Sequence, residues 1–415
     1  MGHGRQEGHM ADDPGLSTAE AAARLGVKRE TLYAYVSRGL LTRTQGADGR
    51  SSRFDPAEVD RFLHTGRRPP SDGELRTVIA TGLTRVDDAG LLVRGRDLVA
   101  EVTAGVTFTQ AVDLLWASPA GEDWPSAIEE ANPAEAAAAA VAPRSPLDAL
   151  RITIALRSAA DALRHDLSPR SVRAVGRSLI VALCRALPPR GPEPGEGATL
   201  TGELWCRLTV EPATPARLRA LDTALALLVD HGLAGSTFAA RIAASVRADP
   251  YSVVAAGLAV VGGTLHGAAS GAVHELLAEA AATGDTTAAV GAVRRRLGRF
   301  PGFGHAVYRE QDPRYGALMA RVVDAWGAEQ GLVTVYRVRD VISQRNDAIP
   351  NVDLALGSLT FLARMPAEAG EVIFAIARTA GWLAHAIEEY EEQPLRFRAR
   401  ERYTGPVTKP SRELN

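Results

Sequence analysis

Residues 262–270 read Gly-Gly-Thr-Leu-His-Gly-Ala-Ala-Ser, and they interrupt a chain that is otherwise patterned for helices. Apolar residues recur at helical spacing both before this stretch, over 250–262, and after it, over 270–282. Because glycine ends helices, the pattern predicts that His266 lies at a break, where the second helix begins. At a helix N-terminus the dipole favours the neutral imidazole, which can donate a hydrogen bond to a carbonyl oxygen as that oxygen gains charge.

Helical periodicity dominates the chain beyond Thr107, and no strands alternate with the helices. The fold class predicted for this body is therefore mainly α rather than a doubly wound sheet. Before it, 77–98 alternates apolar and polar residues as a small hairpin does. Residues 117–145 hold prolines and an alanine run, and they fit either a helix or a loose connection. Further helices are predicted at 146–164, 169–187, 215–230, 235–247, 286–298, 314–329, 334–344, 353–363 and 367–389.

Residues 16–63, near the N-terminus, are predicted to form a separate unit. Ser17 and Glu20 make a capping box for one helix, and a second helix is predicted over 28–38. A polar stretch with a turn at 48–49 follows, and then a short third helix up to residue 63. This order predicts a small winged helix-turn-helix domain, preceded by a disordered segment, 1–15, and followed by a linker, 64–75.

Composition excludes several classes of protein. The 415 residues hold 47 basic and 49 acidic side chains, so any nucleic-acid binding must come from a local patch. Lysine occurs only at Lys28 and Lys409, which leaves no lysine for a phosphate-binding P-loop or for Schiff-base chemistry. Cys184 and Cys206 are isolated, as in cytoplasmic proteins, and give no zinc-ligand spacing. With no signal peptide and no long apolar run, the sequence predicts a cytoplasmic protein that does not enter a membrane.

Two further segments carry candidate site residues in glycine- or proline-rich surroundings. His305 ends a Pro-Gly-Phe-Gly-His stretch, and Arg309 and Arg314 follow it closely. Asp353 ends an Ile-Pro-Asn-Val-Asp stretch at the start of an apolar helix, where a helix-cap role would also explain it. Each residue alone has an ordinary structural explanation. Their joint occurrence with His266 favours a site.

These segments together resemble the active-site signatures of the citrate synthase family, in the family's order and at similar separations. The matching signatures are 265–269, 302–305 with 312–314, and 350–353. The late helix 377–385 and the arginine segment 398–405 agree with the family as well. The resemblance covers 76–406 and leaves 1–75 outside.

The resemblance implies a helical homodimer whose subunits have a large domain, 76–268 with 368–406, and a small domain, 269–367, with a tail at 407–415. The site would lie in the cleft between the two domains. The reaction implied is a Claisen condensation of acetyl-CoA, or propionyl-CoA, with oxaloacetate to give citrate, or 2-methylcitrate, and CoA. The CoA thioester is then a substrate, and neither a cofactor nor a metal is implied.

The resemblance also assigns roles to residues of this chain. In it, Asp353 is the base that takes the acyl proton, His266 donates a hydrogen bond to the thioester oxygen, and His305 polarises the ketone of oxaloacetate. The carboxylate-binding arginines are Arg314, Arg378 and Arg398, the last reaching in from the second subunit. The CoA contacts are Gly302, Phe303, Gly304 and Arg309.

The chain departs from the family at the keto-acid site. Two residues before its Asp-His pair, the family carries a histidine that helps to bind oxaloacetate. In this chain the pair is at 230–231, and Leu228 takes the place of that histidine. A leucine cannot hydrogen-bond to a carboxylate, so the sequence predicts weak binding of oxaloacetate or a different keto acid. Two other hypotheses therefore stay open: a condensing enzyme for another keto acid, and a transcription regulator that uses the enzyme fold as a metabolite sensor. The other departures are Gly232, Ala234, Thr264 and Ser270.

The N-terminal unit resembles the helix-turn-helix domains of MerR-like and excisionase-like proteins. Its charge supports DNA binding only weakly, since residues 1–70 hold eleven basic and nine acidic side chains. A module of this fold could instead form dimer contacts or pack on the enzyme body. The residues expected to face the major groove are Lys28, Arg29, Thr31 and Tyr35, and those expected to contact phosphates are Arg50 and Arg53.

Overall fold

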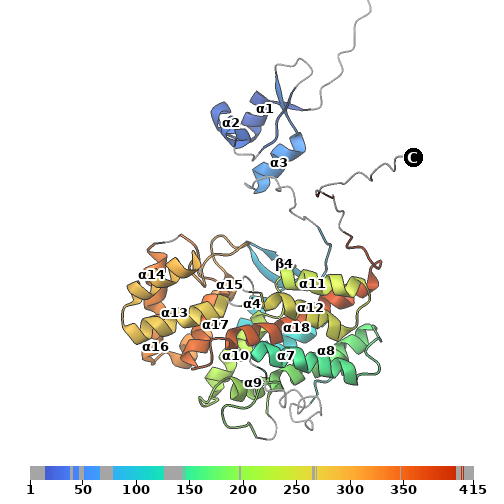
Figure 1. Cartoon of the computed structure of the whole chain (residues 1–415), viewed down its shortest axis with the longest axis vertical. Helices are drawn as coiled ribbons and strands as arrows, with labels where there is room; N and C mark the ends of the chain where they lie inside the picture. The colour runs from blue at the N-terminus through green and yellow to red at the C-terminus, as the bar shows by residue number, and fades with distance from the viewer. Residues whose placement is uncertain are drawn as a thin grey trace, which may run out of the picture. The chain divides into compact units, whose positions relative to one another are not determined.

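The computed structural model divides into two compact units, Met1–Ala80 and Thr81–Asn415 (Figure 1). It describes residues 15–37, 41–45, 51–65, 78–125, 143, 145–195, 198–263, 267, 269–345, 347–398, 403 and 405, with only the backbone of 61 and 63–65. Several predictions fall outside these residues and stay predictions. They concern the N-terminal segment up to 14, the turn at 48–49, most of the linker, the stretch 126–142, His266 and the tail 407–415.

The first unit has the predicted helix-turn-helix order with a small sheet. Its elements are β1 (Leu16–Ser17), α1 (Thr18–Arg24), α2 (Arg29–Ser37), β2 (Thr44–Gln45), β3 (Ser52–Phe54) and α3 (Pro56–Thr65). The sheet is antiparallel in the order β1-β3-β2, with Leu16 opposite Phe54 and Thr44 opposite Arg53. The predicted capping box is confirmed, because Ser17 and Glu20 exchange backbone-to-side-chain hydrogen bonds. A core of Ala21, Ala22, Leu32, Leu41, Phe54 and Val59 holds the unit together.

The second unit opens with a three-stranded antiparallel sheet and continues with helices, which confirms the predicted mainly α class. The hairpin predicted at 77–98 is present and gains a third strand: β4 (Thr84–Asp87), β5 (Gly90–Val93) and β6 (Arg96–Asp97). The helices are α4 (Leu98–Thr103), α5 (Phe108–Trp116), α7 (Pro146–Ala160), α8 (Pro169–Arg185), α9 (Leu200–Leu208), α10 (Pro215–Leu227), α11 (Gly235–Ser245), α12 (Pro250–Val261), α13 (Ala269–Thr283), α14 (Thr286–Leu297), α15 (Pro313–Trp326), α16 (Gln330–Ser343), α17 (Val352–Leu362) and α18 (Ala369–Glu391). Among the described helices, none is long and apolar enough to span a bilayer.

Helix α9 was not predicted from the sequence. Every residue from Thr201 to Leu208 is buried, including Glu203 and Arg207, which pair with each other. The helix has only nine residues, which is shorter than the window over which helical periodicity is recognised. Helix α16 also begins at Gln330, four residues before the predicted start.

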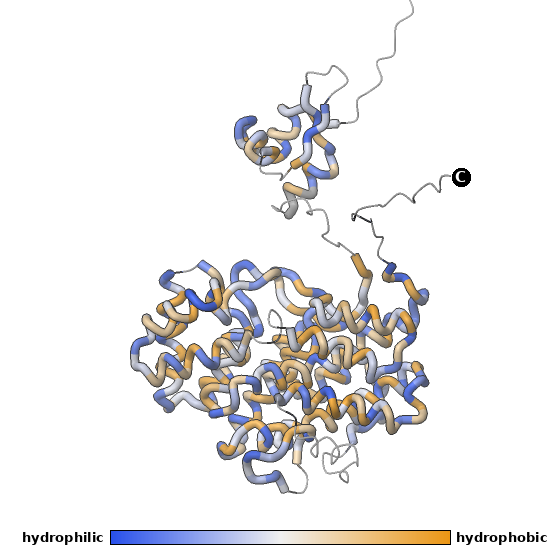
Figure 2. The backbone as a smooth tube through the Cα atoms, in the orientation of Figure 1, coloured by the Kyte–Doolittle hydropathy of each residue, from blue (hydrophilic) through white to orange (hydrophobic). Residues whose placement is uncertain are grey.

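Helix α18 is the centre of the second unit and packs against α8, α11 and α12 (Figure 1). The apolar colouring in Figure 2 is concentrated where these helices meet. Gly257 of α12 permits the contact, since a Cβ at that position would come within 2.5 Å of the Trp382 ring. Helices α13 to α17 pack on one another at one side of the unit, and they contain most of the range predicted as the small domain.

Candidate active site

Two signature loops that lie far apart in the sequence are held side by side. Phe303 and Pro350 form an antiparallel bridge between them. The Asn351 N–H donates to the Gly302 carbonyl at 2.9 Å, and the Asn351 side-chain amide donates to the Gly304 carbonyl at 2.7 Å. The loop that ends in the candidate histidine is therefore fixed against the start of α17.

Gly302 cannot be replaced at this junction without strain. Its φ is +78°, in the left-handed region that favours glycine. A Cβ there would also lie 2.9 Å from Leu354 Cβ and 2.9 Å from Val273 Cγ2. The glycine thus allows the loop to approach two packed helices, α13 and α17.

A cavity of about 160 Å³ opens where these loops meet α10, α15 and α18. It brings together four of the residues predicted for the site: His305, Arg314, Asp353 and Arg378. The rest of the described lining consists of Leu228, His231, Ala234, Gly267, Ser270, Asn351, Val352 and Phe374.

His305 is held as a neutral hydrogen-bond donor. Its Nδ1 accepts from the backbone N–H groups of Val307 at 3.0 Å and Tyr308 at 3.1 Å. A neutral imidazole that accepts at Nδ1 carries its proton on Nε2, a tautomer assigned here from the hydrogen bonds. Burial, together with nearby Arg314, lowers the pKa of His305 and favours this neutral form. Since Arg314 Nη2 lies 3.3 Å from Nε2 and is also a donor, the two groups suit a shared oxygen acceptor.

Arg314 is fixed by Asp312 from its own Asp-Pro-Arg sequence. Its Nε and Nη2 donate to the two carboxylate oxygens at 3.0 and 2.9 Å, and Asp312 is only 2% exposed. The same carboxylate accepts the Val352 N–H at 2.9 Å. One buried carboxylate therefore ties α15, with its arginine, to the first turn of α17.

Asp353 does not cap its helix, so that explanation of the residue is wrong. Asn351 is the N-cap of α17, and its Oδ1 accepts the Asp353 N–H at 3.0 Å. Among the described residues the Asp353 carboxylate has no hydrogen-bond partner. Burial raises its pKa, although the charge of Arg314 opposes the shift. A carboxylate with a raised pKa and no partner of its own is suited to accept a proton from a ligand.

Arg378 is buried in α18 and is anchored by main chain. Its Nε donates to the Leu228 carbonyl at 2.9 Å, and its guanidinium carbon lies 4.6 Å from the centre of the Phe374 ring. Burial lowers the pKa of Arg378 to about 10, although nearby Asp230 opposes the shift. The guanidinium stays charged near neutral pH. Its two Nη groups have no hydrogen-bond partner among the described residues and can bind an anion.

His231 was not singled out from the sequence, although it belongs to the Asp-His pair noted there. It lines the cavity, its Nε2 lies 3.1 Å from Tyr308 Oη, and its ring meets His305 edge-on at 5.2 Å. Burial, Arg314 and Arg378 lower its pKa, so it is neutral. The signal that could have revealed it is its position three residues after Leu228, in the segment that carries the Asp-His pair.

Other predicted residues lie outside this cavity or outside the described residues. Arg398 is exposed and does not line the cavity. Arg309 is also exposed, and its backbone N–H donates to Asp88 in the β4–β5 turn. His266 lies outside the described residues, so its place at a helix break stays a prediction. No group of three or more His, Cys, Asp or Glu side chains suited to a metal ion occurs in the described part of the chain.

In the N-terminal unit, Lys28 and Arg29 are exposed at the start of α2, and Thr31 follows them half-buried. Tyr35 is half-buried against Phe62, with ring centres 4.9 Å apart, and so contributes to packing. Arg53, expected to contact phosphates, donates to the Gly15 carbonyl at 3.2 Å, and Arg50 is not described.

Comparisons with known proteins match two families to the chain. The family model for the citrate synthase C-terminal domain matches residues 75–400, and one for a helix-turn-helix domain matches 16–67. Citrate synthase of Haloferax volcanii is 34% identical over 218 residues, covering 51% of this chain and 57% of that protein. Citrate synthase 2 of Bacillus subtilis is 31% identical over 217 residues, covering 52% and 58%. The matched region thus spans little more than half the length of these curated relatives.

One solved structure shows the same fold along most of its length. Citrate synthase of Thermoplasma acidophilum, solved as a ternary complex with carboxymethyl coenzyme A and oxaloacetate, aligns with a TM-score of 0.66. The alignment covers 80% of this chain and 95% of that one, at 22% identity.

Proposed function

The chain belongs to the citrate synthase family, and we propose that it catalyses a Claisen condensation of acetyl-CoA or propionyl-CoA with oxaloacetate. The products are citrate or 2-methylcitrate and free CoA. The observation that carries the proposal is the convergence of His305, Arg314, Arg378 and Asp353 on one cavity. The thioester is itself a substrate, and the proposed reaction uses neither a metal nor an organic cofactor.

Asp353 is the proposed base. Its carboxylate takes a proton from the carbon next to the thioester carbonyl, and the electron pair moves toward the thioester oxygen. Its raised pKa makes it a stronger base than an ordinary aspartate. A thioester α-proton is too weakly acidic for a carboxylate alone, so the enol oxygen needs a donor. In this proposal His266 supplies that donor.

His305 and Arg314 are the proposed activators of the keto acid. The enol carbon attacks the ketone carbon of oxaloacetate, a C–C bond forms, and charge builds up on the ketone oxygen. The Nε2–H of His305 and the adjacent Arg314 guanidinium are donors at the point where that oxygen is expected. Water then cleaves the thioester of the condensed product and releases CoA.

Arg314 and Arg378 are the proposed carboxylate-binding groups of one subunit. Arg398 is expected to enter the cavity of a second copy, which would make the homodimer the active form. Its exposure on its own chain is compatible with that role. The loop Gly302–Phe303–Gly304 and the exposed Arg309 are the proposed CoA contacts. Two buried free cysteines fit the reducing cytoplasm, where we place the protein.

The keto-acid side of the cavity has an apolar wall. Leu228, Ala234 and Phe374 form it, and the Phe374 ring lies against the Arg378 guanidinium. Leu228 offers its carbonyl to Arg378 but no side-chain donor to a ligand. We expect this wall to weaken the binding of oxaloacetate relative to a cavity with a histidine at position 228.

The test is release of CoA, followed by a thiol reagent, from acetyl-CoA or propionyl-CoA with a panel of 2-oxo acids. Saturable release that depends on oxaloacetate supports the proposal. Release with a different 2-oxo acid alone would support the alternative condensing enzyme. Absence of release with every pair would contradict an enzymatic role and favour the metabolite-sensor hypothesis.

DNA binding by the N-terminal unit is a second proposed activity. Its support is the helix-turn-helix match and the exposure of Lys28 and Arg29 at the first turn of α2. A homodimer would carry two such units, so its site should be a near-palindrome. Selection from random DNA tests this, and the absence of any enriched sequence would contradict it.

A further inference from the structure

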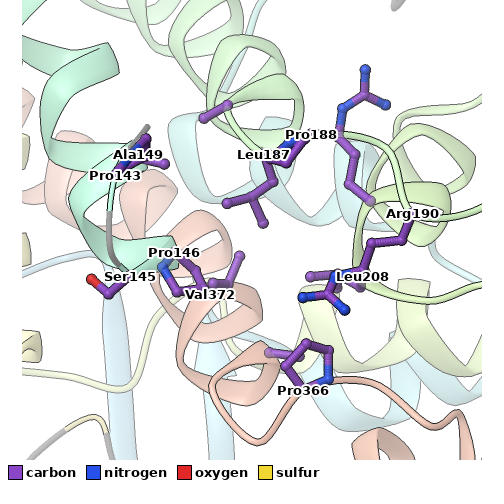
Figure 3. Close-up of a pocket in the computed structure, with 13 residues that line it drawn as sticks. Pro143, Ser145, Pro146, Ala149, Leu187, Pro188, Arg190, Leu208, Pro366 and Val372 are labelled. Carbon is purple, nitrogen blue, oxygen red and sulfur yellow. The ribbon is translucent and has the colours of Figure 1, made fainter. Parts of the chain in front are cut away.

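A second and larger cavity lies in the same unit and shares no described lining residue with the candidate active site. Its volume is about 440 Å³, within the range of small-molecule sites. Figure 3 shows proline and aliphatic side chains facing a common space. The described lining consists of Pro143, Ser145, Pro146, Ala149, Ala186, Leu187, Pro188, Arg190, Arg207, Leu208, Pro366, Ala369 and Val372.

The walls of this second cavity are aliphatic. Leu187, Leu208 and Val372 line it together with alanines and prolines, and none of its described lining residues is aromatic. Such walls offer no ring on which a flat ligand could stack. They do remove methylene groups from water, and each one removed adds to affinity. The shape and chemistry suit an aliphatic chain.

Arginine decides the charge of the second cavity. Arg190 and Arg207 are the charged residues in its described lining, and Arg207 also pairs with Glu203, which is not part of that lining. Arg190 is exposed, and its guanidinium has no partner among the described residues. Helices α7 and α18 begin at the cavity whereas α8 and α9 end there, so the helix dipoles offset one another.

Arg207 adds a donor that lacks an acceptor. The residue is only 7% exposed, and its Nη1 donates to Glu203 Oε2 at 2.7 Å. Its Nη2 makes no hydrogen bond to a described residue and, unlike its Nε, is not fully enclosed by protein atoms. This group can therefore donate to an acceptor in the cavity.

We propose that the second cavity binds a linear aliphatic carboxylate, with the head group at Arg190 and Arg207 and the chain against the aliphatic wall. Binding would also reach the candidate active site through the first turn of α18. Ala369 and Val372 line the second cavity, whereas Gly370 between them packs on Ser270, which lines the active-site cavity. This coupling rests on the proposed function. The binding itself does not.

The test is calorimetric titration of the full chain with decanoate, below its micelle concentration. We expect saturable binding of one molecule per chain. Decanol and decylammonium have the same chain length without the negative charge, and should bind about tenfold more weakly or worse. The Arg190→Ala variant should lose affinity about fivefold or more, since a charge-assisted contact is removed. Arg170→Ala changes an exposed arginine on α8 outside the cavity lining and should leave affinity unchanged.

A second variant tests the position of the chain. Ala186 is half-buried at the end of α8, and Ala186→Trp would fill the cavity and should abolish binding. Circular dichroism and thermal unfolding check that each variant folds. The proposal is overturned if decanoate does not bind. It is equally overturned if decylammonium binds as well as decanoate, or if Arg190→Ala binds like the unmodified chain. Binding without any CoA release would leave this proposal standing and contradict only the proposed function.

Discussion

Replacing Leu228 with histidine should lower the KM for oxaloacetate. Leu228 lines the active-site cavity and is 1% exposed. Its carbonyl accepts a hydrogen bond from Arg378, which fixes the backbone from which the new imidazole would project. Nearby Arg314 and Arg378 disfavour a charged imidazole, as they do for His231. The gain is then that of a neutral donor, about 0.5–1.5 kcal/mol. Because 1.4 kcal/mol is a factor of ten, KM should fall about two- to tenfold.

The assay is steady-state CoA release at saturating acetyl-CoA with varied oxaloacetate. Leu228→Met is the matched control, because it keeps the volume and apolar character of the side chain and adds no donor. Its KM should stay near that of the unmodified chain, and thermal unfolding should show that both variants fold. A folded Leu228→His protein with an unchanged or higher KM would refute the reasoning and indicate that the cavity is shaped for another keto acid.

Other perturbations test the remaining assignments. Asp353→Asn and His266→Ala should each abolish CoA release while circular dichroism shows an intact fold, and turnover near that of the unmodified chain in either variant would contradict the assigned roles. The pKa of Asp353 is raised, and its base form is the active one in the proposed reaction. Activity should therefore fall with decreasing pH through a pKa above that of ordinary aspartate. A loss of activity only at or below the ordinary aspartate pKa would contradict the raised pKa of Asp353. Gly302→Ala should lower the free energy of unfolding by about 2–4 kcal/mol in a denaturant titration, because the positive φ and the 2.9 Å Cβ contacts add strain; an unchanged midpoint would show that the loop relaxes freely. If α2 binds DNA, the Lys28→Ala, Arg29→Ala double variant should lose affinity for the selected sequence in a fluorescence titration, whereas unchanged affinity would contradict the predicted place of these residues in the major groove.

The sequence predicted most of the fold because apolar residues recur at helical spacing along most of the helices. Glycine breaks and N-cap residues placed most helix ends within a few residues, as at α12 and α13. Helix α9 was missed because it has only nine residues and follows the proline- and glycine-rich stretch 188–197. Helical periodicity is recognised over longer windows than that.

The candidate site was predictable only where chemistry and local pattern coincide. His305 follows a glycine-rich stretch, and Arg314 ends an Asp-Pro-Arg sequence. The structure places both residues at the cavity. In the sequence, a helix cap and a base look alike at the start of a helix. The cap explanation of Asp353 could be excluded only from the structure, in which Asn351 is the N-cap. His231 has no local signal of this kind. Its place at the site depends on Tyr308, which lies far along the chain.

The bond between Arg378 and the carbonyl of residue 228 has a consequence for how this protein can evolve. A main-chain carbonyl is present whatever side chain follows it, so the arginine keeps its position through any substitution that preserves the backbone there. In the proposed function, Arg378 would therefore bind a substrate carboxylate whatever side chain residue 228 carries. Substitutions at 228 could then change which keto acid fits the cavity without removing that contact.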